Sequence, residues 1–464
     1  MLIYAVEIFG PTELIAQLMS REEESKASEG LKREIGLLDI VFVSFGGQSP
    51  FLSVLSYGVY AFVLAEGFAP IAIALGTLIV LINGLVIYEL SSRFTKAGGY
   101  MTYAYYTLSE TLGFQTGWLY VFYAVLYGSA YVIAVSLVLG PLFNIDPLVF
   151  TTLVLAIAST LLMLGVRPTT KYAMVASTLE AGIMAFLAIG LLYKTGWHFY
   201  NPFAVSVPAG TLSQAIIFGA GIPTGYGSIA PVSGEVKNAK RNVPLAIIIV
   251  ILLGGGLAAF DTYSIADYLY YKHLTDLGNI GVIDIVSHEF GIITKAIAVF
   301  AALNDGILAT MAFMLAASRT IYALAYYGFF PEKFKVVKPG KGPIYGIALA
   351  LAGSALAVYS LTIEMGSSQA FATLGYLSML AGFLVHVVAN LSLLRISAKK
   401  WRKRLTQIGL AIAGTVMTLI IAVDSIGSTP SSYVIAFLLW MLAGYFYIEA
   451  KSISEELKEE REGP

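Results

Sequence analysis

The sequence contains no cysteine and little charge, because only 12% of its 464 residues are Asp, Glu, Lys or Arg. The lack of cysteine excludes disulfides, thiolate nucleophiles and thiolate metal sites. Only four histidines are present, and they do not have the spacing of a metal site. The net charge of −1 and the lack of a basic groove argue against a nucleic-acid partner.

Apolar residues, in contrast, make up 58% of the chain and recur in long runs. A soluble domain is about 25% charged, so much of this surface needs lipid as its solvent. A membrane-spanning helix needs about 20 apolar residues. Candidate runs lie at 36–62, 69–92, 113–142, 147–165, 170–194, 211–231, 243–263, 291–321, 343–363, 368–395, 406–424 and 432–450. The sequence therefore predicts an all-α polytopic membrane protein with 12 transmembrane helices.

Lysine and arginine fall on one side of this predicted topology. If both termini are cytoplasmic, only Lys194, Lys272 and Lys295 lie outside the cytoplasmic segments, as the positive-inside rule requires. We therefore predict a multi-pass protein of the plasma membrane with cytoplasmic tails at 1–30 and 451–464.

Two predicted spans contain matching interruptions. The first span carries GGQSP at 46–50, and the sixth carries GAGIP at 219–223. Glycine lowers helix stability and proline removes a backbone donor, so both helices are predicted to unwind. Such paired interruptions indicate the midplane binding site of a transporter. Helix packing and kinks are the alternative explanation.

Four stretches resemble the amino acid–polyamine–organocation (APC) superfamily, in the order that the family has. They are LKREIGLLD at 31–39, ELSSRFTKAGGY at 89–100, GEVKNAKRNVP at 234–244 and ASRTIYALA at 317–325. The resemblance implies alternating access, with the substrate held between spans 1, 3, 6, 8 and 10. It also implies proton coupling, with sodium coupling and exchange as variants.

The same resemblance implies a LeuT-type fold. Such a fold has two inverted five-helix repeats, here at 31–200 and 205–398, followed by two extra helices at 399–450.

The sequence departs from the family pattern where amino-acid members hold the substrate carboxylate. The glycine-rich turn of those members falls on Pro50-Phe51-Leu52, and Pro50 has no N–H group. In the sixth span, the acidic residue that is common in the family falls at Gly227. An ordinary α-amino acid is therefore in question as the substrate.

Two carboxyl groups lie inside predicted spans, where a charge costs at least about 2.5–3.5 kcal/mol. Glu180 in the fifth span aligns with a lysine that replaces a sodium ion in proton-coupled relatives. Asp305, beside Asn304, lies near the middle of the eighth span. We predict that these three residues form the coupling or charge-binding group. Hydrogen bonds between helices are the structural alternative.

The predicted substrate-binding residues come from the two interruptions and from a tyrosine stripe in the third span. They are Gly46, Gly47, Gln48, Ser49, Pro50, Phe218, Gly219, Ala220, Gly221, Ile222, Thr224, Tyr123 and Tyr127. The tyrosine stripe is equally compatible with helix packing, and His386 in the tenth span is predicted to be structural.

These observations predict a secondary active transporter of amino acids or related small amines, coupled to protons, with no metal or other cofactor. A sodium-coupled or exchange-type carrier of a polyamine or another non-amino-acid solute remains open, as does a transporter-like nutrient sensor. An enzyme is not expected, because no nucleophile–base pair or phosphate-binding loop is present. A channel filter usually needs rings from symmetric subunits. The expected partners are a small-molecule substrate and the lipid bilayer, with the protein a monomer or homodimer.

Overall fold

The computed structural model describes residues 31–274, 281–428 and 430–462. Within these ranges the chain is helical and has no strand, only two isolated β-bridges. Ten of its helical segments are long and apolar enough to cross a membrane, by length and composition. The chain is therefore a multi-pass helical membrane protein.

The helices follow one another with short connections. They are α2 (Leu37–Gly47), α3 (Pro50–Ser53), α4 (Val59–Ala65), α5 (Ala69–Ser91), α6 (Tyr100–Thr107), α7 (Glu110–Phe143), α8 (Pro147–Leu164), α9 (Val166–Lys194), α10 (Ala209–Gly221), α11 (Ala239–Tyr271), α12 (Val282–Phe290), α13 (Ile292–Tyr326), α14 (Ile344–Ala398), α15 (Leu405–Ser428) and α16 (Ser431–Glu462). A π-helix, η1 (Val54–Gly58), joins α3 to α4, and 3-10 helices η4 (Ile222–Ser228) and η5 (Ala230–Glu235) follow α10.

Two of the ten membrane segments are 55 residues long, and each is interrupted. A straight helix of that length would extend about 80 Å, far beyond the roughly 30 Å of hydrocarbon in a bilayer. Leu37–Ser91 changes direction after α4, where Glu66 has φ 46° and ψ −132°. In α14, Gly366 has φ 79° and ψ 161°, which a residue without Cβ adopts readily.

Helix starts and ends follow the local sequence. Asp146 accepts a hydrogen bond from the Leu148 N–H group at 2.8 Å, and Pro147 occupies the first helical position of α8. Gly165, at φ 118°, ends α8, and a Cβ there would collide with the Gly340 carbonyl. The predicted fourth span, 147–165, therefore matches α8 closely.

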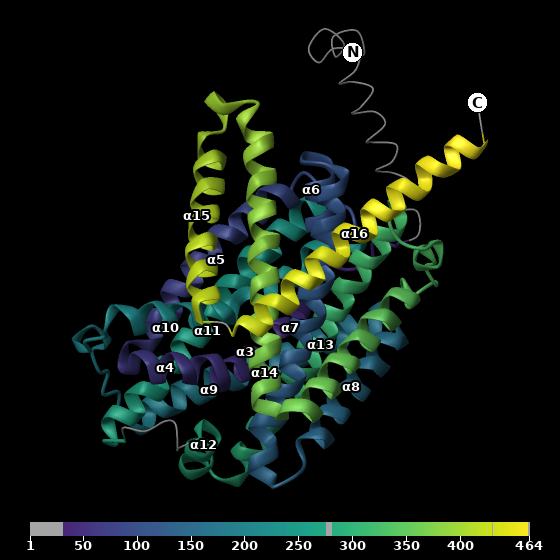
Figure 1. The fold of residues 1–464 in the computed structure, drawn as a ribbon. Coiled ribbons are helices and arrows are strands. Elements are labelled where there is room, and N and C mark those ends of the chain that lie inside the picture. The colour runs from purple at the N-terminus through teal and green to yellow at the C-terminus, as the bar shows by residue number, and fades with distance from the viewer. Residues whose placement is uncertain (1–30, 275–280, 429, 463–464) are drawn as a thin grey trace.

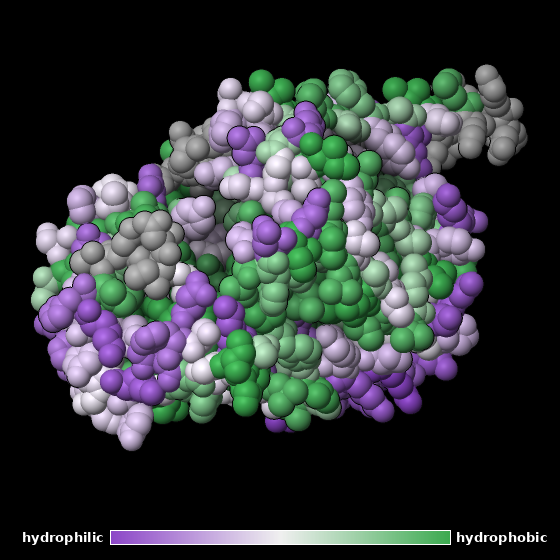
Figure 2. All heavy atoms as spheres, turned by 90° about the horizontal axis from the view of Figure 1, so that it is seen from below, coloured by the Kyte–Doolittle hydropathy of each residue, from purple (hydrophilic) through white to green (hydrophobic). Residues whose placement is uncertain are grey.

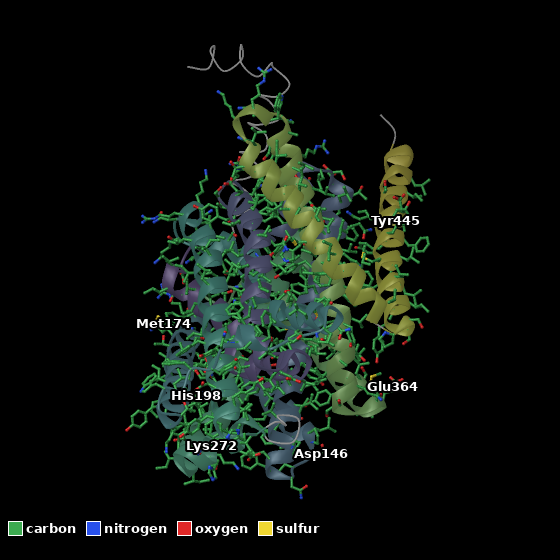
Figure 3. The ribbon with its side chains drawn as sticks, turned by 90° about the vertical axis from the view of Figure 1, so that its left-hand side faces the viewer. Asp146, Met174, His198, Lys272, Glu364 and Tyr445 are labelled. Carbon is green, nitrogen blue, oxygen red and sulfur yellow. The ribbon has the colours of Figure 1, made fainter. Side chains whose placement is uncertain are left out.

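The connecting segments gather at two ends of the molecule. Figure 1 places α6 near the upper end and α12 at the lower end. The predicted topology places four of the residues labelled in Figure 3 on or near the external side, namely Asp146, His198, Lys272 and Glu364. All four lie toward the lower end of the molecule in that view. Seen from below, green apolar residues cover much of the surface, with purple hydrophilic residues in several groups among and beside them (Figure 2). The gathering of the connecting segments at two ends agrees with helices that run between two membrane surfaces.

Three of the family-like stretches meet around one buried ion pair. Arg319 donates from Nε and Nη2 to the two carboxylate oxygens of Glu235, at 2.8 Å each. Arg319 is 0% exposed and Glu235 only 3%. The Glu235 carbonyl accepts from the Ile35 N–H group at 3.0 Å, and the Lys237 N–H group donates to the Ile35 carbonyl at 2.8 Å. The start of span 1, the end of span 6 and the end of span 8 are thereby fastened together.

Candidate functional site

The two predicted interruptions are present in the structure. In the first span α2 ends at Gly47, Ser49 has left-handed backbone angles (φ 45°, ψ 59°), and a second half-helix begins at Pro50. In the sixth span the α-helix ends at Gly221 and the chain continues as 3-10 helix. Span 1 thus consists of two helical halves joined by irregular backbone, and span 6 consists of an α-helical half followed by a 3-10 half.

The two interruptions touch each other. The Gln48 side-chain amide donates to the Pro223 carbonyl at 2.9 Å and to the Val250 carbonyl at 3.1 Å. The Ser44 hydroxyl donates to the Gly225 carbonyl at 3.2 Å. A Cβ on Gly225 would lie 2.5 Å from the Gln48 backbone nitrogen, so only glycine allows this approach. Side chains of span 1 therefore satisfy unwound carbonyls of span 6.

Backbone donors at the span 1 break are all engaged. The Gln48, Ser49 and Ser53 N–H groups donate to carbonyls within the same span. Phe51 donates its N–H to Glu180 Oε1 at 3.2 Å, and Leu52 donates to Asp305 Oδ2 at 2.6 Å. Pro50 has no N–H group. No backbone donor between residues 48 and 53 is left for a substrate.

Glu180 and Asp305 together cap the second half of span 1. Glu180 comes from α9 and is 1% exposed, while Asp305 comes from α13 and is 0% exposed. Because they bind consecutive amides, their carboxyl groups lie beside one another at the positive end of this half-helix. Glu180 Oε2 and Asp305 Oδ1 have no hydrogen-bond partner within the described ranges. Each carboxyl group of the pair therefore has one oxygen atom that accepts no hydrogen bond from the described residues.

Asn304 does not join this pair. Its side-chain oxygen accepts a hydrogen bond from the Tyr172 hydroxyl at 2.5 Å, which links α13 to α9. Gly46 also has a packing role, since a Cβ there would lie 2.7 Å from Ser177 Oγ and 2.9 Å from the Leu308 side chain. The structure thus places the carboxyl pair, and not Asn304, at the start of α3.

A cavity of about 60 Å³ lies beside the break in span 6, between α5, α7, α14 and α15. Among the predicted binding residues, Tyr123, Tyr127, Ala220, Gly221 and Thr224 line it. The remaining predicted residues are not in its lining. They are Gly46, Gly47, Gln48, Ser49, Pro50, Phe218, Gly219 and Ile222.

Phe218 does not line the cavity itself, but its ring lies 6.2 Å (centroid to centroid) from that of Tyr57, which does. The Phe218 ring stacks on Tyr60, with 5.3 Å between the ring centroids and 11° between the ring planes. Phe218 therefore packs α10 against α4.

Sequence reasoning missed several residues of the cavity. Tyr57, Asn83, Tyr226 and His386 all line it. His386 Nε2 lies 3.3 Å from the Tyr226 hydroxyl, while Nδ1 has no partner within the described ranges. A signal was present in the tenth span, because His386 and Asn390 are spaced i, i+4 and so share one helix face.

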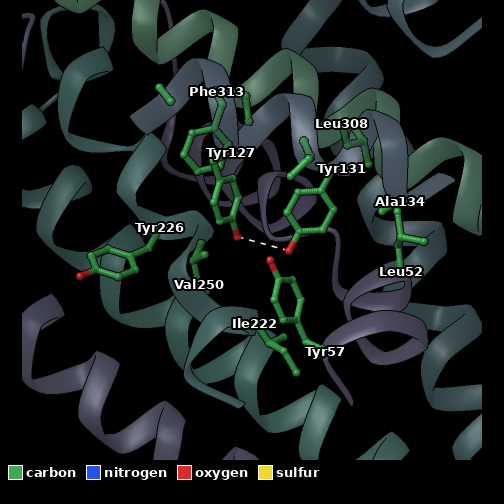
Figure 4. Close-up of a cluster of buried hydrophobic side chains, with 14 of the residues drawn as sticks. Leu52, Tyr57, Tyr127, Tyr131, Ala134, Ile222, Tyr226, Val250, Leu308 and Phe313 are labelled. Atoms are coloured by element: carbon green, nitrogen blue, oxygen red, sulfur yellow. Dashed lines mark hydrogen bonds between the residues drawn. The ribbon is translucent and has the colours of Figure 1, made fainter. Parts of the chain in front are cut away.

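A chain of hydroxyl groups connects the cavity to the span 1 break. The Tyr127 hydroxyl lies 3.2 Å from Thr224 Oγ1 and 3.3 Å from the Tyr131 hydroxyl. Figure 4 shows the Tyr57 hydroxyl pointing toward this tyrosine pair. Tyr131 in turn lies 2.8 Å from Ser53 Oγ, which donates to the Gln48 carbonyl at 2.8 Å. Ser53 follows directly after Leu52, whose N–H group binds Asp305.

Comparison with known proteins gives a consistent result. The family described as Amino acid permease matches residues 39–447. The chain is 23% identical over 328 residues to the low-affinity putrescine importer PlaP of Escherichia coli K12, covering 66% of this chain and 69% of the relative. It is 26% identical over 399 residues to the methylthioribose transporter of Bacillus subtilis, covering 76% and 82%.

A further similarity is to the serine/threonine exchanger SteT of Bacillus subtilis, at 26% over 265 residues, covering 54% of this chain and 58% of the relative. The family and these relatives are transporters and not enzymes.

Proposed function

Because the chain belongs to the amino acid permease family, we propose that it is a secondary transporter that moves a small organic solute by alternating access, coupled to protons at Glu180 and Asp305. The observation that carries this proposal is the buried carboxyl pair on consecutive amides of a broken helix. Each carboxyl has one oxygen without a donor within the described ranges. A proton satisfies such an oxygen, and a shared proton would satisfy both.

A proton suits this pair better than a sodium ion does. A bound metal ion needs several oxygen ligands around one point, as the coordination of calcium and magnesium illustrates. No group of three or more His, Asp or Glu side chains that could hold a metal occurs in the described part of the chain. The neighbouring Ser49 hydroxyl is already committed to the Asp305 carbonyl, at 2.8 Å. Sodium coupling is therefore the alternative outcome of the test below.

Proton binding would change the hold on the half-helix. A charged carboxylate at a helix N-terminus interacts favourably with the helix dipole, whereas a neutral acid gives up most of that interaction. Protonation of Glu180 or Asp305 therefore weakens the attachment of α3 to α9 and α13. The hydroxyl chain through Ser53 and Tyr131 transmits a movement of α3 to the cavity.

The proposal includes the full membrane topology. Two interrupted 55-residue segments that each cross twice would bring ten candidates to twelve spans. We place the inverted repeats of a LeuT-type arrangement at 31–200 and 205–398, with the last two spans at 399–450. The breaks in the first and sixth spans support this arrangement. Both termini are proposed to be cytoplasmic, in the plasma membrane, although residues 1–30 lie outside the described residues.

The test is uptake into proteoliposomes under an imposed pH gradient, and separately under a sodium gradient. The panel contains the solutes after which the related transporters are named, namely putrescine, serine, threonine, methylthioribose and the cationic amino acids. Uridine and adenosine extend it to other uncharged solutes. We expect accumulation of one solute class when the pH gradient is imposed, and none without a gradient.

Two variants locate the coupling site. Glu180→Gln is expected to abolish gradient-driven accumulation but to leave exchange of labelled for unlabelled solute. Glu364→Gln is the matched control, since this carboxyl is exposed at the bend of α14. Accumulation by Glu180→Gln at the wild-type level would remove this residue from the coupling site. If only a sodium gradient drives accumulation, then sodium and not the proton is the coupling ion.

A further inference from the structure

The chemistry of the cavity beside span 6 indicates which class of solute it takes. Its surface is largely aromatic, with Tyr57, Tyr123, Tyr127 and Tyr226 around it. At about 60 Å³ it is well below the roughly 300–1,000 Å³ of typical ligand pockets. An organic solute therefore enters only when these side chains move apart.

The cavity lining carries no fixed charge. Among the residues that the structure describes, no Asp, Glu, Lys or Arg lines it. Its polar groups are neutral hydroxyls, the Asn83 amide and the His386 imidazole. His386 Nδ1 has no hydrogen-bond partner in the described ranges, so it remains available to a solute. Such a surface suits a molecule with apolar faces and a few hydrogen-bonding groups.

A zwitterionic amino acid finds no free partner for its carboxylate here. Helix N-termini bind anions through exposed N–H groups. At the span 1 break those groups already donate to the chain itself, and two of them donate to Glu180 and Asp305. A substrate carboxylate would have to displace one of these buried acids.

An ammonium group would meet unwound carbonyls of span 6 that already accept hydrogen bonds from the protein. Gly221, Pro223 and Gly227 accept from Thr224, Gln48 and Tyr120, at 2.5, 2.9 and 2.8 Å. Glu180 and Asp305 are tied to α3 and do not line the cavity. Tyrosine faces attract cations, but a cation without a counter-charge at this depth is costly.

We propose that the substrate is an uncharged organic solute with an aromatic or other apolar face and hydroxyl or ring N–H groups, and not an amino acid or a diamine. This inference rests on the proposed transport function and names the substrate class of the same site. The tyrosine rings pack on the apolar face of the solute. Thr224, Tyr123 and His386 provide its hydrogen bonds. The carboxyl pair is left to carry the proton.

Binding to the purified protein in detergent tests this inference without any gradient. A ligand that binds only the folded protein raises its unfolding temperature. The probes are uridine, adenosine and methylated ribose as uncharged solutes, the common amino acids as zwitterions, and putrescine, spermidine and choline as cations. We expect the largest stabilisation from an uncharged probe. Stabilisation by a zwitterion or a cation instead, or by no uncharged probe, would overturn the inference.

Cavity variants then show where the probe binds. Tyr123→Phe and Thr224→Val each remove one neutral hydroxyl, so each should weaken binding about three- to tenfold. Tyr445→Phe is the matched control, because this tyrosine lies on the outlying helix α16 and is 49% exposed. Unchanged affinity in both cavity variants would place the probe elsewhere and overturn the assignment.

The two proposals can fail separately. If an uncharged probe binds in the cavity but is not accumulated under any gradient, then the transport proposal fails and the substrate class stands. If an amino acid or putrescine is accumulated under a pH gradient, then the transport proposal stands and the substrate class is wrong.

Discussion

The buried pair between Glu235 and Arg319 gives the sharpest prediction about stability. Arg319→Ala removes two charge-assisted hydrogen bonds of 2.8 Å and leaves a carboxylate that is only 3% exposed without its counter-charge. Removing one partner of a buried pair lowers the free energy of unfolding by about 3–5 kcal/mol. Arg319→Lys keeps the charge but loses the two-pronged geometry, so we expect a smaller loss.

The assay is denaturant unfolding of the detergent-solubilised protein, arranged as a double-mutant cycle. Glu235→Leu and Arg319→Met are measured singly and together. The double variant should be far more stable than the sum of the single losses predicts, because no unpaired charge remains buried. The half-exposed i, i+4 pair between Glu89 and Arg93, at 2.9 Å, is the control, and Glu89→Ala should lose less than about 1 kcal/mol. Additive losses in the Glu235–Arg319 cycle would refute the reasoning.

Two further predictions concern a close contact and a carboxyl group, that of Glu289, whose side chain is only 9% exposed. Gly225→Ala places a Cβ 2.5 Å from the Gln48 backbone, so uptake and unfolding temperature should both fall, while Gly182→Ala, which meets nothing within 4 Å, should change neither. A hydrogen bond from the Tyr268 hydroxyl lowers the pKa of Glu289 below its ordinary value of 4.5. Its stabilising contribution is therefore complete above pH 4.5 and disappears as the pH falls through the lowered pKa. Thermal unfolding of wild type and Glu289→Gln should differ at pH 7 and converge in strong acid; curves that stay apart would contradict this assignment.

Much of the fold could be predicted because lipid imposes length and composition on each helix. The apolar runs locate the membrane segments, and the predicted third span, 113–142, lies within α7. Glycine and proline also locate both interruptions, since they act on the local backbone whatever surrounds it. The burial of Glu180 and Asp305 could be predicted for the same reason, because each follows from position within an apolar run.

The composition of the site was harder to predict. In water, an apolar stripe marks the inner face of a helix, but lipid is as apolar as the protein interior, so the pattern does not show which face turns inward. The pattern therefore does not show that Phe218 stacks on Tyr60, and its place in the binding site stays a prediction. Asn83 was missed because the contribution of span 2 to the cavity depends on packing between distant helices. His386 was missed because the pattern does not show which face of span 10 turns toward the cavity.

The hydrogen-bond donors and acceptors at the span 1 break relate the proposed coupling site to the proposed substrate class. Breaking a helix in a membrane releases N–H and C=O groups that must be satisfied within the protein. Here Glu180 and Asp305 take two of the released N–H groups, and each keeps one oxygen without a donor in the described ranges. What remains at the break is a surplus of acceptors, which in the proposed mechanism would bind protons and repel a substrate carboxylate. An uncharged solute in the neighbouring cavity would avoid that repulsion. The hydroxyl chain through Tyr131 and Ser53 connects this cavity with α3, the helix whose attachment is proposed to depend on the proton.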